Sequence, residues 1–167
     1  MLIRDCAPAD LPAVAAIYAH HVRTGTGSFE EEAPDLAEMT SRWRDIHARA
    51  LPWLVAEANG VVRGYCYAGP FRTRSAFRFT VENAVYVAPD ALGQGVGRAL
   101  LGELIARCAA AGYREMIAVI GDSANEGSIR LHASLGFRPA GALQDVGFKF
   151  GRWLDCILMQ RSLDDRS

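Results

Sequence analysis

Three glycines at alternating positions, Gly93, Gly95 and Gly97, lie in the segment VYVAPDALGQGVGRALL, which begins at Val85. Because glycine lacks a side chain, a turn so rich in it lets main chain approach another group closely. A strand, a glycine turn and a helix starting near Gly95 would direct free amide N–H groups and a positive helix end to one point. Such a point is suited to binding a phosphate group.

The residues around the glycines separate three kinds of phosphate site. A P-loop needs Lys and then Ser or Thr after its last glycine, whereas Gly97 is followed by Arg98 and Ala99. A Rossmann turn has the spacing G-x-G-x-x-G, and the spacing here is G-x-G-x-G. The pattern fits best with the diphosphate of coenzyme A on the turn and its extended arm along the preceding strand. A tight turn without a ligand is the alternative.

A carboxylate lies on that preceding strand, which we predict from Arg78 to Val87. The strand alternates, with three valines on one face and Glu82, Ala84 and Tyr86 on the other. A carboxylate in this position could act as a general base, for example by taking a proton from an ammonium group, which has no lone pair with which to attack. Glu82 is our candidate for that base, and main-chain N–H groups from Val85 to Val87 are candidates for stabilising the oxyanion. A solvated strand carboxylate is the alternative.

Hydrophobic periodicity and turn signals predict the elements that position these groups. In chain order they are a strand at Leu2 to Asp5, a helix capped by Asp10, a loop from Arg23, a helix from Leu36 to Ile46, a hairpin at Asn59-Gly60, the strand at Arg78 to Val87, a helix from the glycine turn to Gly112, the buried strand EMIAVIG, a helix from Asn125 to Leu135 and a closing pair around Phe150-Gly151.

The composition predicts one globular domain over residues 1–167. A net charge of −1 gives no basic field for a nucleic acid, so we expect no nucleic-acid partner. The apolar runs are too short to cross a membrane, and MLIRDCAPAD lacks the layout of a signal peptide. We therefore expect no membrane association and a cytoplasmic location.

No metal site is expected. The cysteines are widely spaced among apolar neighbours, which is typical of buried free thiols: Cys6, Cys66, Cys108 and Cys156. His20 and His21 are adjacent on a predicted helix, so their side chains would point about 100° apart, a poor arrangement for one metal ion.

Two motifs resemble those of a known family, and the resemblance covers nearly the whole chain. The segment from Val85 resembles the acetyl-CoA-binding motif of the GNAT family of N-acetyltransferases, and NEGSIRLHASLGF from Asn125 resembles the motif that follows it. Within the family, YAGPFRTRSAF, TVENAVYV and GFKFGRWLD resemble the branch that acetylates phosphinothricin, methionine sulfoximine and methionine sulfone. One departure is Leu92, where the family usually has Gln or Arg, so a side-chain contact to phosphate would be missing.

The resemblance implies an α/β (α+β) fold: a mixed, mostly antiparallel sheet of six to seven strands flanked by about four helices. It also implies acetyl-CoA as co-substrate, direct transfer of acetyl to the amino group of a small amino acid or analogue, and a homodimer. Acetylation of a protein N-terminus or a polyamine, and a non-catalytic acyl-CoA-binding domain, are the alternatives.

Site residues follow from the motifs and the resemblance together. The expected cofactor-binding residues are Val85, Tyr86, Val87, Gly93, Gln94, Gly95, Val96, Gly97, Arg98 and Asn125. The expected substrate-binding residues are Phe29, Arg72, Thr73, Arg74, Glu82, Asn83 and Ala84, because arginine can grip a carboxylate with two hydrogen bonds.

Some of these roles have structural alternatives. His132 takes the place of the family's proton-donating tyrosine, so Glu82 and His132 are the catalytic candidates, although His132 could equally be a packed helix residue. Asn125 could be only a helix cap, and Phe29 only a core residue. Lys149 and Arg152 flank the last hairpin and could approach the site from the same or a neighbouring subunit.

Overall fold

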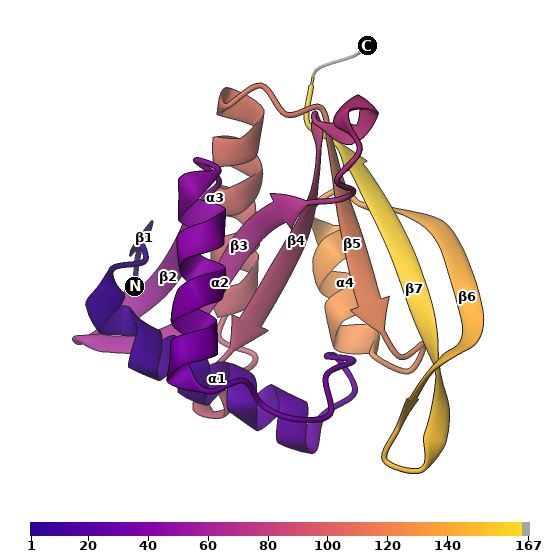
Figure 1. The fold of residues 1–167 in the computed structure, drawn as a ribbon, viewed down its shortest axis with the longest axis horizontal. Coiled ribbons are helices and arrows are strands. Elements are labelled where there is room, and N and C mark those ends of the chain that lie inside the picture. Colours follow the sequence, from indigo (N-terminus) through magenta and orange to yellow (C-terminus); the bar gives the residue numbers. More distant parts are fainter. Residues whose placement is uncertain (165–167) are drawn as a thin grey trace.

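A single seven-stranded sheet forms the centre of the computed structural model, which describes residues 1–164. The strand order is β1-β2-β3-β4-β5-β7-β6, and β4–β5 is the parallel pair in an otherwise antiparallel sheet (Figure 1). The strands are β1 (Leu2–Asp5), β2 (Trp53–Ala58), β3 (Val61–Pro70), β4 (Thr80–Val87), β5 (Glu115–Gly121), β6 (Arg138–Lys149) and β7 (Arg152–Ser162). The predicted fold class is confirmed.

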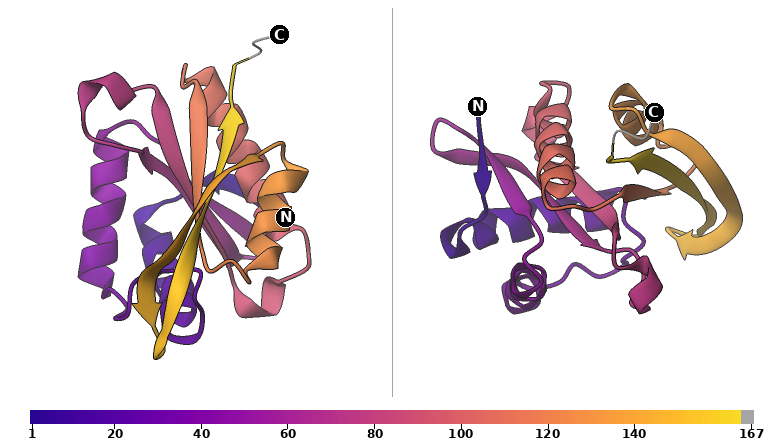
Figure 2. Two further views of the ribbon diagram at one scale, coloured as in Figure 1. Left: turned by 90° about the vertical axis from the view of Figure 1, so that its right-hand side faces the viewer. Right: turned by 90° about the horizontal axis from the view of Figure 1, so that it is seen from above.

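Helices cover both faces of this sheet. Two of them, α1 (Leu11–Thr24) and α2 (Leu36–Ala48), lie on one face, while α3 (Val96–Ala110) and α4 (Glu126–Ser134) lie on the other (Figure 2). The apolar stripe predicted for α3 is buried against the sheet, and its buried residues are Val96, Leu100, Leu101, Leu104, Ile105 and Cys108. This burial fixes the helix that follows the glycine turn and so fixes where its first turn points.

Local turn chemistry sets both predicted hairpins. Asn59-Gly60 between β2 and β3 has φ values of 53° and 77°, and Phe150-Gly151 between β6 and β7 has φ values of 53° and 73°. Positive φ at both central residues matches the twist of antiparallel strands in a two-residue turn. The two hairpins therefore lie where the sequence predicts them.

Asp10 does not cap α1 as predicted. It has helical dihedral angles and makes no side-chain capping bond. Its carboxylate instead accepts hydrogen bonds from the Arg4 guanidinium at 2.7 and 2.9 Å and from the Ala7 amide at 2.8 Å. A strand arginine brought close by the fold thus replaces the local cap.

The two parallel strands part after a short paired stretch. Thr80–Asn83 of β4 pair with Glu115–Ala118 of β5, and no pairing continues beyond Asn83 and Ala118, whereas β3 pairs with β4 as far as Val87. Figure 1 shows the strands diverging from this point. The β5-facing edge of Ala84–Val87 therefore borders a gap instead of a neighbouring strand.

Candidate functional site

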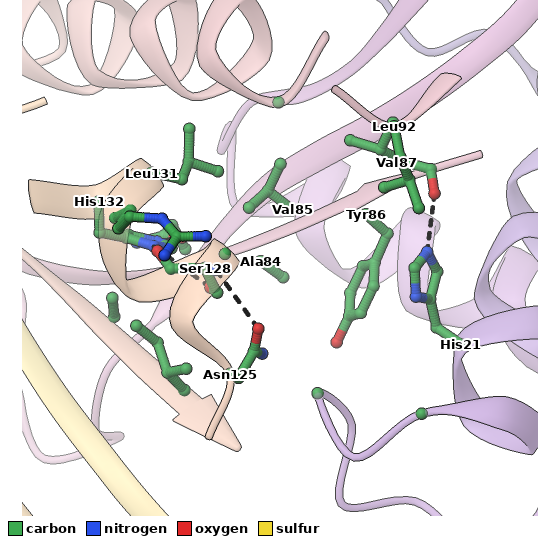
Figure 3. Close-up of a pocket in the computed structure, with 18 of the residues that line it drawn as sticks. His21, Ala84, Val85, Tyr86, Val87, Leu92, Asn125, Ser128, Leu131 and His132 are labelled. Carbon is green, nitrogen blue, oxygen red and sulfur yellow. Dashed lines mark hydrogen bonds between the residues drawn. The ribbon is translucent and has the colours of Figure 1, made fainter. Parts of the chain in front are cut away.

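A cavity of about 880 Å³ occupies the gap between β4 and β5 (Figure 3). It brings together twelve of the residues predicted for the site: Glu82, Asn83, Ala84, Val85, Tyr86, Val87, Gly93, Gly95, Val96, Gly97, Asn125 and His132. These come from β4, the glycine turn, the start of α3, the N-cap of α4 and the last turn of α4. One cavity thus joins the expected phosphate turn to the expected catalytic residues.

The three glycines are required for two different reasons, a positive φ at Gly93 and Gly95 and a close helix contact at Gly97. Gly93 and Gly95 have φ values of 73° and 80°, which are unfavourable for residues with a Cβ atom, and no heavy atom lies within 4 Å of a Cβ built on either. Gly97 lies in the first turn of α3, where a Cβ would be 3.2 Å from a methyl group of Leu131. Gly95 offers no capping side chain, so the first N–H groups of α3 are available to a ligand.

Two side chains at the glycine turn, Gln94 and Arg98, do not line the cavity. The Gln94 amide donates a hydrogen bond to the carbonyl oxygen of Asp90 at 2.9 Å, and the Arg98 guanidinium donates one to the Ser134 hydroxyl at 2.8 Å. Neither residue lines the cavity, whereas exposed Leu92 does. A diphosphate on this turn would therefore rely on main-chain amides.

The end of β4 packs against α1 on one face of the sheet. On the α1 side, the Tyr86 ring packs against Tyr18 at 5.0 Å and against His21 at 5.4 Å between ring centroids. His21 also donates from Nε2 to the carbonyl oxygen of Val87 at 2.7 Å, because a carbonyl can only accept. The end of β4 is thereby fixed to α1 beside the glycine turn.

Glu82 lies where β4 and β5 begin to part. Its side chain is half-buried, and it also borders a second pocket of about 190 Å³ with Tyr67, Gly69 and Pro70. Burial raises the pKa of the Glu82 carboxyl, and the positive charge of Arg72 partly opposes that rise. Such an environment makes a carboxylate more basic than an exposed glutamate.

His132 and Asn83 form a buried contact on the opposite face of β4 from Glu82. Asn83 donates from Nδ2 to the carbonyl oxygen of Ile117 at 3.2 Å, which leaves its Oδ1 facing His132 Nε2 at 3.0 Å. The other ring nitrogen, Nδ1, lies 2.8 Å from the carbonyl oxygen of Ser128. Burial lowers the pKa of His132, and a neutral ring has one N–H for these two acceptors.

The structure shows Asn125 in its capping role. Its Oδ1 accepts a hydrogen bond from the Ser128 amide at 3.3 Å and so caps α4. Asn125 also lines the cavity, so its main chain lies next to the space that a ligand would occupy.

The expected substrate residues outside β4 do not line the cavity. Arg72, Thr73 and Arg74 are exposed in the segment before β4, with the Arg72 guanidinium 4.8 Å from the centre of the Phe71 ring. Phe29 is 40% exposed and packs on β5 and β6, where a Cβ on Gly147 would overlap its ring and a Cβ on Gly121 would lie 3.3 Å from it. Only Arg72 is tied to the site, through its effect on the pKa of Glu82.

Sequence reasoning missed six polar residues that line the cavity: His21, Thr26, Tyr67, Asp122, Ser128 and Arg130. The Thr26 hydroxyl donates to Asp122 Oδ2 at 2.7 Å across 96 residues of sequence. Asp122 follows the carboxyl end of β5, which is a common place for ligand-binding residues in sheets with parallel strands. That position is the one sequence signal that could have identified it.

The last hairpin reaches the site within its own chain. Lys149 donates from Nζ to the carbonyl oxygen of Ser28 at 2.9 Å, and Arg152 forms a 2.6 Å ion pair with Asp122. Both residues therefore support the cavity from behind, and neither lines it.

Within residues 1–164, no group of three His, Cys, Asp or Glu side chains could hold a metal ion. The four cysteines are buried and free. None of the helices in that range has the length and apolar character needed to cross a membrane.

Comparison with known proteins identifies the family. The model described as "Acetyltransferase (GNAT) family" matches residues 14–137. A phosphinothricin N-acetyltransferase of Alcaligenes faecalis is 59% identical over 93% of this chain and 79% of its own length. An L-methionine sulfoximine/L-methionine sulfone acetyltransferase of Pseudomonas aeruginosa is 46% identical over 97% of this chain and 94% of its own length.

Solved structures agree with the observed fold. A GNAT superfamily phosphinothricin acetyltransferase from Sinorhizobium meliloti, in complex with acetyl-CoA, superposes with a TM-score of 0.95 at 46% identity over 98% of this chain and 89% of that one. A ribosomal-protein-alanine N-acetyltransferase from Brucella melitensis superposes with a TM-score of 0.94 at 42% identity over 97% of this chain and 99% of that one.

Proposed function

Because this chain belongs to the acetyltransferase (GNAT) family and is an acetyl-CoA-dependent N-acetyltransferase, we propose that it acetylates the amino group of a small amino acid of the phosphinothricin, methionine sulfoximine or methionine sulfone type. The observation that best supports this proposal is that the glycine turn and Glu82 line the same cavity, between the diverging ends of β4 and β5.

The cavity fits an extended cofactor. The N–H groups of the glycine turn and of the first turn of α3 bind the diphosphate, since a helix N-terminus favours negative charge. The pantetheine arm lies along Ala84–Val87, whose β5-facing edge has no strand beside it, and its amides form hydrogen bonds with this edge. The thioester then lies near Glu82, where the strands part.

Glu82 is the general base in this proposal. Its carboxylate takes a proton from the substrate ammonium, directly or through a water molecule, and the freed nitrogen lone pair attacks the thioester carbon. A main-chain N–H of Val85 to Val87 stabilises the negative oxygen that results. The C–S bond breaks, and the sulfur leaves as a thiolate that takes up a proton.

His132 is our candidate donor of that proton. It lines the cavity on the α4 side, with Nε2 facing Asn83 Oδ1 at 3.0 Å and Nδ1 facing the carbonyl oxygen of Ser128 at 2.8 Å. To donate, the ring must be in its protonated imidazolium form, because a neutral ring that lost its proton would become an imidazolate. Burial lowers the pKa of His132 and so opposes the form that donation requires.

The acceptor is proposed to be small because of the charges that lie next to Glu82. Arg72 is close enough to lower the pKa of Glu82, and Arg74 follows two residues later; an amino-acid carboxylate is the complementary group for both. A polyamine would meet repulsion here. A peptide N-terminus is the second candidate, because the Brucella melitensis structure named for ribosomal-protein alanine is 42% identical.

Thiol release from acetyl-CoA across a panel of acceptors tests the proposal. The panel contains phosphinothricin, methionine sulfoximine, methionine sulfone, ordinary amino acids, polyamines and alanine-initiated peptides. We expect acceleration by the first three acceptors and no response to polyamines. A response to peptides or polyamines alone would overturn the substrate assignment.

We also infer a homodimer in the cytoplasm. Five large apolar side chains of the last hairpin are exposed, namely Leu143, Val146, Phe148, Phe150 and Trp153. Such a group of exposed apolar residues is typical of an association surface. The four free cysteines support a reducing compartment.

A further inference from the structure

One side of the cavity is formed by the wall loop, residues 25–30, which follows α1. Gly25, Thr26 and Gly27 line the cavity from this side. The loop lies directly on the end of β5, since a Cβ on Gly121 would overlap the carbonyl oxygen of Thr26. At Gly27 it approaches α4, where a Cβ would lie 3.5 Å from Asn125 Nδ2. The wall loop thus extends from α1 to the start of α4 beside the gap between β4 and β5.

Asp122 is the polar residue that fixes the wall loop at this point. Its Oδ2 accepts a hydrogen bond from the Thr26 hydroxyl at 2.7 Å and one from the Arg152 guanidinium at 2.6 Å, while Oδ1 accepts from the Ala124 amide at 3.0 Å. The side chain is buried, with 6% of the residue exposed, and its φ is 74°. These donors lower the pKa of Asp122, so the carboxylate is charged.

The rest of the wall loop also contacts β5 and β6. Lys149 on β6 donates to the carbonyl oxygen of Ser28 at 2.9 Å, and the ring of Phe29 fills the space left by Gly121 and Gly147. These contacts lie beyond the cavity lining, whereas Thr26 and Asp122 are part of it. The Thr26–Asp122 hydrogen bond is therefore the polar contact that sets the loop position at the cavity itself.

We propose that Asp122 is a positioning residue that, through Thr26, keeps the wall loop closed over the arm of bound acetyl-CoA. Asp122 does not touch the reacting atoms in this proposal. It keeps main chain of residues 25–27 against the cofactor and keeps water out of the gap. The inference rests on the proposed placement of acetyl-CoA between β4 and β5. If Asp122 only stabilised its own turn, the Thr26 hydroxyl would be dispensable for binding.

The variant Thr26→Val tests this, because it removes the hydroxyl and keeps the shape of the side chain. We expect acetyl-CoA to bind about tenfold more weakly by calorimetry, as for the loss of a hydrogen bond to a charged group. We expect the KM for acetyl-CoA to rise by a similar factor while kcat changes by less than about twofold. Thr26→Ser keeps the donor and should restore wild-type values.

Thr40→Val is the matched control. Thr40 donates its hydroxyl to the Leu36 carbonyl oxygen within α2 and does not line the cavity, so the same chemical change should leave KM and binding unaltered. Asp122→Asn is a second variant, which removes the negative charge. Asparagine tolerates the positive φ of this position and keeps a side-chain oxygen that can accept from the Ala124 amide. It should weaken acetyl-CoA binding, and combined with Thr26→Val it should add little.

Two results would overturn the inference while leaving the proposed function intact: Thr26→Val binding acetyl-CoA as the wild type does, or Thr26→Val and Thr26→Ser losing thermal stability and kcat together. Failure of the proposed cofactor site would look different, because the wild type would then bind acetyl-CoA without any protection of the glycine turn from hydrogen exchange.

Discussion

At the scale of single residues, the chemistry of the site depends on how Glu82 is surrounded. Burial raises its pKa and the charge of Arg72 lowers it. A general base works only when it is deprotonated, so kcat/KM should fall as the pH falls through the pKa of Glu82. This acidic limb should lie above the pH at which an exposed glutamate titrates.

Removing the charge of Arg72 should therefore move the acidic limb further toward neutral pH. We expect this shift in a pH profile of kcat/KM for Arg72→Gln, together with a weaker KM for the amino acid. Arg78→Gln, a change in the same exposed segment, serves as the control.

Glu82→Gln should lower kcat by roughly 100-fold or more and leave acetyl-CoA binding intact. An unchanged profile in Arg72→Gln, or a fully active Glu82→Gln, would contradict the assignment.

Asn83 shows where reasoning from the sequence ends at this scale. The alternation of β4 correctly places Glu82 and Asn83 on opposite faces, but the sequence suggests a substrate contact for Asn83. In the structure its amide bonds to Ile117 and faces His132, which are 34 and 49 residues away. Strand alternation can predict which face a side chain occupies, but its partner depends on the register of β5 and the packing of α4.

At the scale of elements, the glycine turn and α3 could be predicted from the sequence because the signals for them are local. Turn glycines, a helical stripe and a terminal glycine each act through their near neighbours. The parting of β4 and β5 after Asn83 has no such signal, since both strands continue with apolar residues. The cavity that it creates could be predicted only from the family resemblance.

Replacing Gly95 by alanine tests the turn against a control in the same helix. Gly95 and Gly112 precede and follow α3 with φ values of 80° and 87°, and a Cβ on either would meet no heavy atom within 4 Å. Both substitutions should cost about 1 kcal/mol of stability from backbone strain. Only Gly95→Ala should weaken acetyl-CoA binding in calorimetry, because its main chain lines the cavity. Equal binding by the two variants would remove the turn from the site.

At the scale of the whole molecule, the last hairpin connects the site to the exposed surface. Next to its turn, Lys149 supports the wall loop directly and Arg152 does so through Asp122, while the rings of Phe148 and Trp153 pack together on the outside with centroids 4.9 Å apart. Trp153 is 63% exposed, an unusual position for the largest apolar side chain unless another molecule covers it. The proposed homodimer would bury this surface.

Sedimentation velocity measures that association directly. We expect the wild type to sediment as a dimer and Trp153→Glu to sediment as a monomer, because a buried, unpaired charge opposes association. Val146→Glu, on the same hairpin, should act in the same direction. Val61→Glu is the control, since Val61 is 52% exposed at the start of β3, next to the other hairpin turn. A monomeric wild type would exclude the proposed dimer, and a dimer that survives both hairpin changes would place the association surface elsewhere.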